Sequence, residues 1–523
     1  MADLLRHSLL WRLWQWLKDL CRRSLTGRLL GKLWHSRFAN GCRRLLEKAP
    51  AAERSVPARA MRRLNRGLWR LGQRLEPVKE RSLVVRAWRA LKRGLRHSLI
   101  LRRICAGGVI TLVLTALGLF GIIDWLLRDA FSVPVLSSYW DELLLILGLL
   151  LVLHQRLASP QPLRDRTNVL DLPVLQFLVV CLTLFFLTAS VPRSIDLSGL
   201  RATAQSILWF FVLTRLLRDA ADVRRIYLCM VLAAFLISLH GIWQYIVRVP
   251  IPPNWTDQAE LSVRTRVYSI FGSPNILGDF LLLFTPMTLA LAYWYKTPWR
   301  KLLSIGMALC MLAACLFTMS RGAWIGMLVS VLVFSLLVDL RLLALIGFGG
   351  VFSLAIPFVS NRVLYLFSNA FAESTARGGR QVRWEKALGY LKLYADPDYG
   401  MGFGRFGGAV AMQNQVDPRL QYFYVDNYYI KILVENGHIG LASYLLMMLG
   451  VLWAGFRSWF ACRRSKRRPL VSGMFAGLCG VLVHCYFENI FEEPYMLVYF
   501  WTIAAMMVFL GMRERDGADA AGR

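Results

Sequence analysis

Acidic residues and histidine are scarce in this sequence, whose 523 residues include 32 Asp and Glu and seven His against 63 Lys and Arg. Seven of the ten cysteines fall in hydrophobic runs and three in basic segments, so they predict neither a disulfide framework nor a metal site. Charges interrupt the N-terminus every few positions, and we expect no cleavable signal peptide there. These absences exclude a disulfide-rich scaffold and leave a metal or other cofactor without predicted ligands.

Hydrophobic residues dominate the chain, making up 56% of it, and the mean hydropathy is +0.45. A helix needs about 20 apolar residues to cross a bilayer, and most of twelve hydrophobic segments are near that length. We place them at about 105–127, 136–155, 172–191, 199–217, 225–247, 274–295, 301–319, 322–338, 341–359, 430–457, 470–488 and 494–512. The sequence therefore predicts an all-α, polytopic membrane protein with about 12 transmembrane helices.

The connections between these segments differ in charge, and those that hold most Lys and Arg are expected inside the cell. This rule predicts a multi-pass protein of the plasma membrane with both termini in the cytoplasm and the 361–428 connection outside. We divide the chain into a basic segment (1–104), a transmembrane domain (105–512) that includes this outer catalytic loop, and a cytoplasmic tail (513–523).

The first 104 residues supply most of the net charge of +31, because they hold 27 Lys and Arg against 6 Asp and Glu. Leu10, Leu13, Trp14 and Leu17 share one face of a predicted amphipathic helix. Beside so many spans we favour contact with anionic lipids, at about 1 kcal/mol per basic residue, over a nucleic-acid partner. A small soluble helical bundle that binds protein partners is the alternative.

The connection at 361–428 is far longer than the roughly 4–6 residues usual between the elements of a compact protein. It is rich in Trp, Tyr and Phe, which a solvated tether lacks, so we expect a folded cap over the mouth of a helical bundle. Within it, a helical period over 380–391 predicts one face formed by Trp384, Ala387, Leu388 and Leu391.

Two arginines fall at the expected outer end of the bundle. Arg321, in TMSRGAWIG between two predicted spans, is either a functional cation or a side chain that reaches lipid phosphates. Arg380 begins the helix of the outer loop, where its side chain and the free N–H groups of a helix start could hold a phosphate. An exposed charge on a solvated helix is the alternative for Arg380.

Two further motifs of the loop are ambiguous. PDYGMGFGRFGG, which contains Arg405, lacks the GxxxxGK[ST] pattern, and its GxGxxG is not set between a strand and a helix, so it predicts a tight turn. Asp426 and Asn427 precede the next helix, and Asp426 is either its N-cap or a general base that faces an acceptor hydroxyl. Gly437 and Gly440 are expected to break that helix before the following span.

Other polar residues gather at the expected outer ends of spans, namely Asn275, Asp279, Glu488, Glu492 and Glu493. The carboxylates either bind a cation or sugar hydroxyls, or keep a short outer loop polar, and we favour the second interpretation because nothing fixes a metal geometry. Three histidines are expected to pack or to hydrogen-bond within the protein, namely His240, His438 and His484.

Four motifs, in this order and spacing, resemble the O-antigen ligase/polymerase superfamily of membrane glycosyltransferases: FGSPNILGDFLL, TMSRGAWIG, GGRQVRWEKALGYLKLYADPDYGMGFGRFGG and VDNYYIKILVENGHIGLASYLL. The resemblance covers about residues 170–510 and leaves residues 1–104 outside it. It implies that a glycan is transferred from a polyprenyl diphosphate to an acceptor hydroxyl on a glycan, a lipid or a protein, at the outer face of the plasma membrane. It also implies that no nucleotide sugar, metal or other cofactor takes part.

The resemblance further implies roles for particular residues. Arg321 and Arg380 would bind the donor diphosphate and stabilise it as a leaving group, because guanidinium groups offset the negative charge that develops there. The superfamily's usual His-Asn pair is here Asp426-Asn427, so Asp426 would accept the proton of the acceptor hydroxyl. The side chains expected to contact substrate are Asn275, Arg383, Trp384, Arg405 and Asn427.

Two other classes of function are compatible with the sequence. One is a multi-span transporter of a small anion, since relatives have carried the label of inorganic carbon transporter, and the other is a scaffold that recruits partners through residues 1–104. Transporters often contain inverted repeats and helices broken at the midplane. No convincing repeat occurs here and polar residues gather at the expected outer mouth, which favours chemistry on a lipid-linked saccharide.

Overall fold

The computed structural model describes residues 15–16, 56–81, 108–131, 134–161, 163, 166–188, 192–250, 265–355, 357–364, 379–414 and 423–521. The helices are α5 (Val56–Arg81), α8 (Gly108–Gly118), α9 (Phe120–Trp125), α10 (Pro134–Ala158), α11 (Asp171–Thr188), α12 (Arg193–Ala204), α13 (Leu208–Leu216), α14 (Ala220–Ile246), α15 (Pro274–Trp294), α16 (Pro298–Phe317), α17 (Arg321–Val338), α18 (Arg341–Ser353), α19 (Pro357–Leu364), α21 (Arg380–Tyr394), α22 (Ala409–Asn414), α23 (Tyr428–Ala461), α24 (Arg468–His484) and α25 (Pro494–Ala521). Leu126–Ala130 form a π-helical turn, and Gln205–Ile207 and Ile490–Glu492 form 3₁₀ turns. The described residues contain no strand, only an isolated bridge between Asp396 and Gly400.

Seven of the described helices are long and apolar enough to cross a membrane, namely α11, α14, α15, α16, α17, α23 and α25. An eighth candidate combines 108–118 with 120–130, but these two pieces meet at a bend of 79°. α18 and α24 are apolar but shorter. The prediction of an all-α membrane protein with many apolar helices is confirmed, whereas only seven or eight of the twelve predicted spans meet this test in the described part of the chain.

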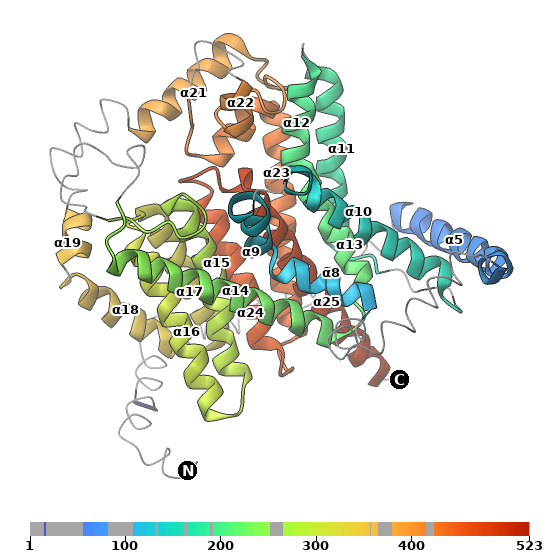
Figure 1. Cartoon of the computed structure of the whole chain (residues 1–523), viewed down its shortest axis with the longest axis horizontal. Helices are drawn as coiled ribbons and strands as arrows, with labels where there is room; N and C mark the ends of the chain where they lie inside the picture. The colour runs from blue at the N-terminus through green and yellow to red at the C-terminus, as the bar shows by residue number, and fades with distance from the viewer. Residues whose placement is uncertain are drawn as a thin grey trace, which may run out of the picture.

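The predicted span at 199–217 is wrong as a single helix. α12 ends at Ala204, the 3₁₀ turn follows, and α13 then continues for nine residues. The sequence does not reveal this division, because the apolar residues of 199–217 belong mainly to α13. The preceding helix, α12, carries charged side chains such as Asp196 and Arg201. α12 instead packs against α22, in the part of the molecule that lies above the helical bundle (Figure 1).

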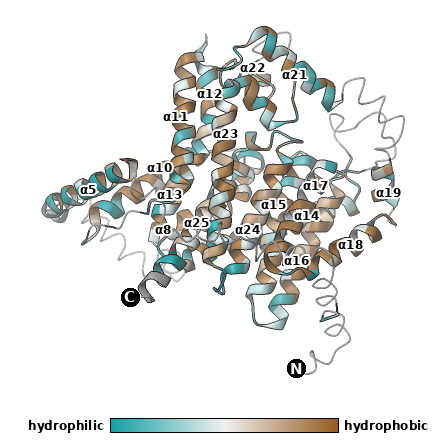
Figure 2. Ribbon diagram, turned by 180° about the vertical axis from the view of Figure 1, so that it is seen from behind, coloured by the Kyte–Doolittle hydropathy of each residue, from teal (hydrophilic) through white to brown (hydrophobic). Residues whose placement is uncertain are grey.

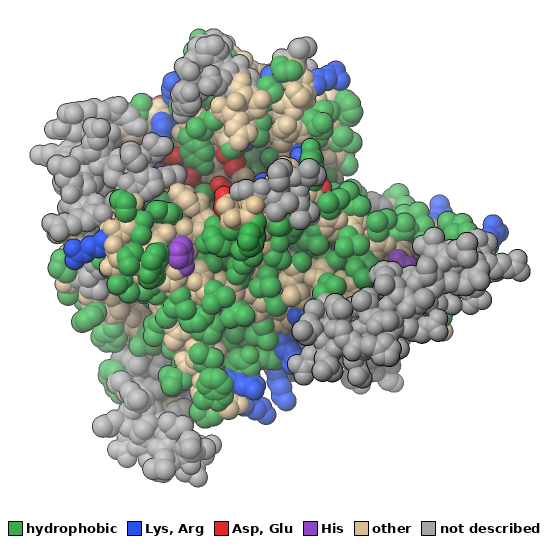
Figure 3. All heavy atoms as spheres, viewed as in Figure 1, with side chains coloured by type: hydrophobic (Ala, Val, Ile, Leu, Met, Phe, Trp, Pro, Cys, Tyr) green, Lys and Arg blue, Asp and Glu red, His purple; other side chains and the backbone are tan. Residues whose placement is uncertain are grey.

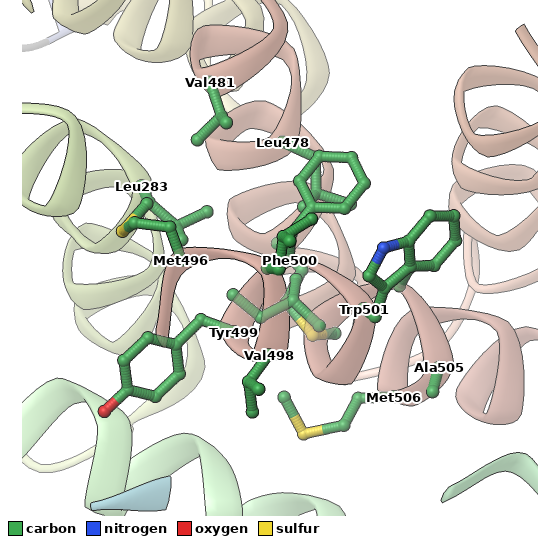
Figure 4. Packing of buried hydrophobic residues seen from close by; sticks show 14 of the residues in the cluster. Leu283, Leu478, Val481, Met496, Val498, Tyr499, Phe500, Trp501, Ala505 and Met506 are labelled. Atoms are coloured by element: carbon green, nitrogen blue, oxygen red, sulfur yellow. The ribbon is translucent and has the colours of Figure 1, made fainter. Parts of the chain in front are cut away.

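α25 and α15 run through the middle of the bundle and are buried on nearly all sides. Figure 4 shows Met496, Tyr499 and Trp501 of α25 among apolar side chains that include Leu478 of α24 and Leu283 of α15. Glycines allow α24 to lie close to α15, because a Cβ on Gly477 would come within 2.3 Å of the Leu283 carbonyl oxygen. The outer spans leave apolar faces exposed, as expected of helices that face lipid (Figure 2).

The end of the bundle at which α15 and α17 begin is covered by α21 and α22, and we call it the capped end (Figure 1). α21 buries Ala387 and Leu391 as predicted, but Tyr390 rather than Leu388, which is 39% exposed. Residues 365–378 and 415–422 of the predicted cap lie outside the described residues.

PDYGMGFGRFGG forms the tight turn that its glycines predict and lies against the first turns of α23. The Met401 N–H donates to the Val434 carbonyl oxygen (3.0 Å), and the Gly402 N–H donates to that of Glu435 (2.9 Å). α23 is kinked at Gly437, which has a φ of 65°, so the predicted break at this glycine is confirmed. A Cβ on Gly437 would lie 2.2 Å from the Asp398 carbonyl oxygen, which means that the kink and the turn fit only without a side chain there.

In the basic N-terminal segment, α5 packs against α10, where a Cβ on Gly72 would lie 2.0 Å from the Leu157 carbonyl oxygen. Pro77 lies inside α5 and does not end it. The predicted amphipathic face at 10–17 falls almost wholly outside the described residues. The contact of this segment with anionic lipids therefore stays a prediction.

Candidate functional site

Three arginines from separate parts of the chain meet at the capped end. Arg321 is the first residue of α17, Arg380 is the first residue of α21, and Arg266 lies in the segment before α15. Burial and the positive charges of Arg321 and Arg380 lower the pKa of Arg266 to about 10. Burial is the larger cause, and the repulsion from Arg321 and Arg380 means that the three guanidinium groups lie near one another, which makes the cluster a site for an anion.

Local backbone structure fixes two of these arginines. Ser320 is the N-cap of α17, and its hydroxyl accepts the Ala323 N–H (3.4 Å), so α17 starts at Arg321. The Arg266 guanidinium donates to the Thr318 carbonyl oxygen (3.1 Å) and to Asn275 Oδ1 (3.4 Å). Arg266 is therefore held against the same α16–α17 break that presents Arg321.

Asp426 faces the arginines of α21. Its carboxylate pairs with Arg383 and lies 3.7 Å from Arg380 Nε. Burial, together with the negative charge of Glu488, raises the pKa of Asp426 from 3.8 to about 6, although the two arginines oppose this shift. A carboxyl group with this pKa is ionised near neutral pH and is a stronger base than an ordinary aspartate.

The backbone conformation of Asp426 also determines where its side chain lies. Asp426 has a φ of 50°, in the left-handed region that costs a residue with a side chain about 1 kcal/mol or more. Asn427, not Asp426, caps α23, because its Oδ1 accepts the N–H groups of Tyr429 (3.0 Å) and Ile430 (3.1 Å). The N-cap interpretation of Asp426 is therefore wrong, and its carboxylate is left to face the arginines.

Glu488 is a buried acid of the same site, and it connects Asn275 to Tyr424. The Asn275 side chain donates to Glu488 Oε2 (2.6 Å), and the Tyr424 hydroxyl hydrogen-bonds to the same carboxylate. The favoured interpretation of Glu488 as a residue that keeps an outer loop polar is wrong, since only 4% of it is exposed. Figure 3 shows acidic side chains in the hollow between the part that contains α21 and α22 and the bundle below.

Trp384 supports the segment that carries Asp426. Its indole N–H donates to the Val425 carbonyl oxygen (3.0 Å), and its ring packs edge to face against Tyr486 at 5.0 Å between ring centres. The Nε groups of Arg380 and Arg383 are buried and find no hydrogen-bond acceptor within the described part of the chain. The site thus has guanidinium donors that an anionic ligand can use.

Arg405 does not join this site. Its guanidinium donates to both carboxylate oxygens of Asp196 on α12 (2.6 and 2.9 Å) and to the Pro192 carbonyl oxygen (3.2 Å). Both side chains of the pair are buried. We therefore correct the interpretation of Arg405 as a substrate-binding residue: it fastens the glycine-rich turn to α12.

Replacing Arg405 with methionine is expected to lower the free energy of unfolding by about 3–5 kcal/mol, because it leaves Asp196 buried and unpaired. Thermal unfolding of the detergent-solubilised protein measures the effect. Arg193→Met on the exposed side of α12 is the control and should change stability by about 0.5 kcal/mol or less. An unchanged thermal stability in Arg405→Met would contradict this structural role.

Two more acidic groups are paired internally. Lys431 Nζ contacts Glu435 Oε2 (2.5 Å) and Glu492 Oε1 (3.3 Å), and the Phe406 N–H donates to Glu435 Oε1 (3.2 Å). These pairs fix the turn onto α23. Within the described ranges, no group of three or more His, Cys, Asp and Glu side chains is arranged to hold a metal ion.

Below the arginines, His484 of α24 hydrogen-bonds through Nδ1 to Asp279 of α15 (2.9 Å), and both side chains are buried. A Cβ on Gly322 would lie 3.1 Å from His484 Nε2, so the imidazole supports the start of α17 directly beside Arg321. The expectation that this histidine hydrogen-bonds within the protein is confirmed. His240 and His438 also have partners, Ser269 (2.9 Å) and Asp398 (3.5 Å).

The structure brings together six of the eight residues proposed from the sequence, namely Asn275, Arg321, Arg380, Arg383, Trp384 and Asp426. Asn427 is adjacent but uses its side-chain oxygen to cap α23. Sequence reasoning missed Arg266 and gave Glu488 a different role. The local signal for Arg266 is a basic residue just before the FGSPN motif, which does not reveal that it lies near Arg321.

Comparison of the sequence with known proteins relates this site to a protein family. No match was found among curated proteins. Residues 306–445 match the model of the family described as O-antigen ligase, a range that contains Arg321, Arg380 and Asp426. This match confirms that the chain resembles the O-antigen ligase/polymerase superfamily.

Proposed function

We propose that this protein is a membrane glycosyltransferase, a ligase or polymerase, that transfers a glycan from a polyprenyl diphosphate to an acceptor hydroxyl in cell-surface polysaccharide assembly. The observation that carries the proposal is the meeting of Arg266, Arg321 and Arg380 beside the buried carboxylate of Asp426. Three cations suit a diphosphate, and a carboxylate beside them suits a hydroxyl that must lose its proton. The match of residues 306–445 to the O-antigen ligase family supports the same general class of reaction.

The arginines act on the donor. The bond between the anomeric carbon of the glycan and the diphosphate oxygen breaks, and the polyprenyl diphosphate leaves with the bonding electron pair. Arg266, Arg321 and Arg380 stabilise the negative charge that develops on the leaving oxygen. Because Arg266 and Arg321 are positioned by backbone groups of one helix break, they need little rearrangement when the donor binds.

Asp426 acts on the acceptor. Its carboxylate takes the proton of the acceptor hydroxyl as the acceptor oxygen forms its bond to the anomeric carbon. Arg383 holds the carboxylate in place, and Trp384 holds the backbone next to it. Asp426 replaces the superfamily's usual histidine here, and its raised pKa compensates in part for the lower basicity of a carboxylate.

We assign the capped end to the outer face of the plasma membrane and both termini to the cytoplasm, because basic residues crowd the connections at the other end. The donor is then a lipid whose diphosphate lies at the membrane surface. The acceptor is a glycan, a lipid or a protein that approaches from outside. No metal or nucleotide sugar is required by this scheme, since the leaving group arrives already activated as a diphosphate.

Transfer is expected to depend on pH through Asp426. The pKa of Asp426 in the folded protein is about 6, so the carboxyl gains its proton as the pH falls through that value and the base is lost. We expect kcat/KM to be flat above pH 7 and to fall about tenfold for each pH unit below 6. Initial rates between pH 4.5 and 8 measure this, and a flat profile down to pH 5 would exclude Asp426 as the base.

The proposal as a whole is tested in a strain from which the gene is deleted, complemented with the wild type, Arg321→Gln, Arg380→Gln or Arg193→Gln. We expect deletion and both site variants to accumulate polyprenyl-diphosphate glycan and to lose the transferred product, as measured by mass spectrometry. Arg193→Gln, on the exposed side of α12, should restore transfer. An unchanged glycan profile in the deletion strain, with no redundant relative present, refutes the proposed function.

A further inference from the structure

A cavity lined by basic side chains lies at the far end of α15. A cavity of about 340 Å³ opens between the start of α14 and the connection from α15 to α16. Its wall contains Arg224 of α14, Trp294 and Tyr295 at the end of α15, and Lys296 and Arg300 of the connection and of α16. α15 has 21 residues and is about 30 Å long, so this cavity is a bilayer's thickness away from the arginines of the capped end.

The charge of this cavity is positive. Arg224, Lys296 and Arg300 line it, and no acidic side chain of the described chain does. The nearest acid on α14, Asp222, is occupied by Arg218 (2.7 Å) and Arg225 (3.4 Å). Arg300 additionally lies over the Tyr295 ring at 5.6 Å, which holds the guanidinium at the rim. These three exposed cations form no ion pair within the described part of the chain, so their charge is available to an anion from outside.

The adjoining wall is apolar. A neighbouring cavity of about 230 Å³ shares Arg224 and Trp294 with the first and continues along Leu470 and Leu510. Its one further cation, Arg467, is paired with Glu514 (2.5 Å). A soluble anion would make no favourable contact with this apolar extension. A lipid, in contrast, can place its headgroup among the cations and its acyl chain along the leucines. Trp294 and Tyr295 are the residue types that proteins place at the level of lipid headgroups.

We propose that Arg224, Lys296 and Arg300 form a binding site for the phosphate of an anionic phospholipid, with Trp294 and Tyr295 at the headgroup level. The site is separate from the arginines that we assign to the donor, and it carries no part of glycan transfer. Its occupant fastens the start of α14 to the connection between α15 and α16. The lipid thereby stabilises α14 and α15. Arg266 and Asn275 lie at the opposite ends of these helices, in the segment before α15 and in its first turn.

The test is lipid-dependent thermal stability of the full-length protein in detergent. Phosphatidylglycerol, phosphatidylcholine and glycerol 3-phosphate are titrated separately while the unfolding midpoint is recorded. Only phosphatidylglycerol should raise the midpoint of the wild type. In the triple variant Arg224→Gln, Lys296→Gln, Arg300→Gln, the concentration of phosphatidylglycerol at half effect should increase about 100-fold.

A matched control removes three charges from the connection between α23 and α24, where Arg463, Arg464 and Lys466 are equally exposed. This variant should keep the response of the wild type, and so should Arg321→Gln, whose defect concerns the donor. The proposal fails if the first triple variant keeps the response, if the control loses it equally, or if glycerol 3-phosphate reproduces it. Because Arg321→Gln is scored by transfer and the triple variant by lipid response, failure of one assignment is separable from failure of the other.

Discussion

Replacing Asp426 with asparagine should lower the rate of glycan transfer by about 100- to 10,000-fold, the range expected when a general base is lost. Asparagine keeps the shape of the side chain but cannot accept the proton of the acceptor hydroxyl. The helix should be unaffected, since Asn427 provides the cap of α23. Single-turnover rates of the purified variant, with saturating donor, measure the effect on the chemical step.

Asp426→His is the informative control, because it restores the His-Asn pair usual in the superfamily. It should recover a part of the activity, with a pH dependence that follows the imidazole instead of the carboxyl group. The thermal stability of all three proteins should be similar. An Asp426→Asn variant that keeps more than a third of the wild-type rate would contradict the assignment of this carboxylate as the base.

Replacing Arg321 with glutamine is expected to lower transfer by about 100- to 1,000-fold, the usual loss when a donor to a developing negative charge is removed. Arg266→Gln should have an effect of similar order, because the two guanidinium groups face the same anion. Rates measured with limiting and saturating donor separate lost binding from lost stabilisation of the leaving group. Arg248→Gln, an exposed arginine after α14, should leave the rate unchanged.

The double variant of Arg266 and Arg321 distinguishes a shared ligand from two unrelated defects. Two groups that act on one diphosphate should lose less together than the product of their separate losses. Strictly multiplicative losses would contradict the convergence of the arginines on one anion.

The parts of the site that local sequence determines were predictable. Arg321 and Arg380 begin helices because a Ser N-cap or a glycine precedes each of them, and the start of a helix is a local property. The kink at Gly437 was predictable for the same reason, since a residue without a Cβ is needed at that φ.

The parts that depend on distant partners were not predictable. Arg405 looks like a loop arginine until Asp196, 209 residues away, is found beside it. Asp426 and Asn427 are adjacent in sequence, and the hydrogen bonds from the Tyr429 and Ile430 N–H groups to Asn427 Oδ1 show that Asn427 caps α23. Arg266 has no periodic neighbours, and its role follows from the Thr318 carbonyl oxygen and the charges of Arg321 and Arg380. The division of 199–217 arises in the same way, from packing of α12 beside α22.

The most direct test of the central claim uses the purified protein with lipid-linked glycan and acceptor, both extracted from the deletion strain, so that neither needs to be identified beforehand. Free polyprenyl diphosphate and the glycosylated acceptor are quantified together by mass spectrometry. We expect the wild type to release one polyprenyl diphosphate for each glycan transferred, without added metal or nucleotide, and Asp426→Asn and Arg321→Gln to release almost none. Donor that stays intact with folded wild-type protein, while the same protein moves a small anion across a vesicle membrane, would contradict it.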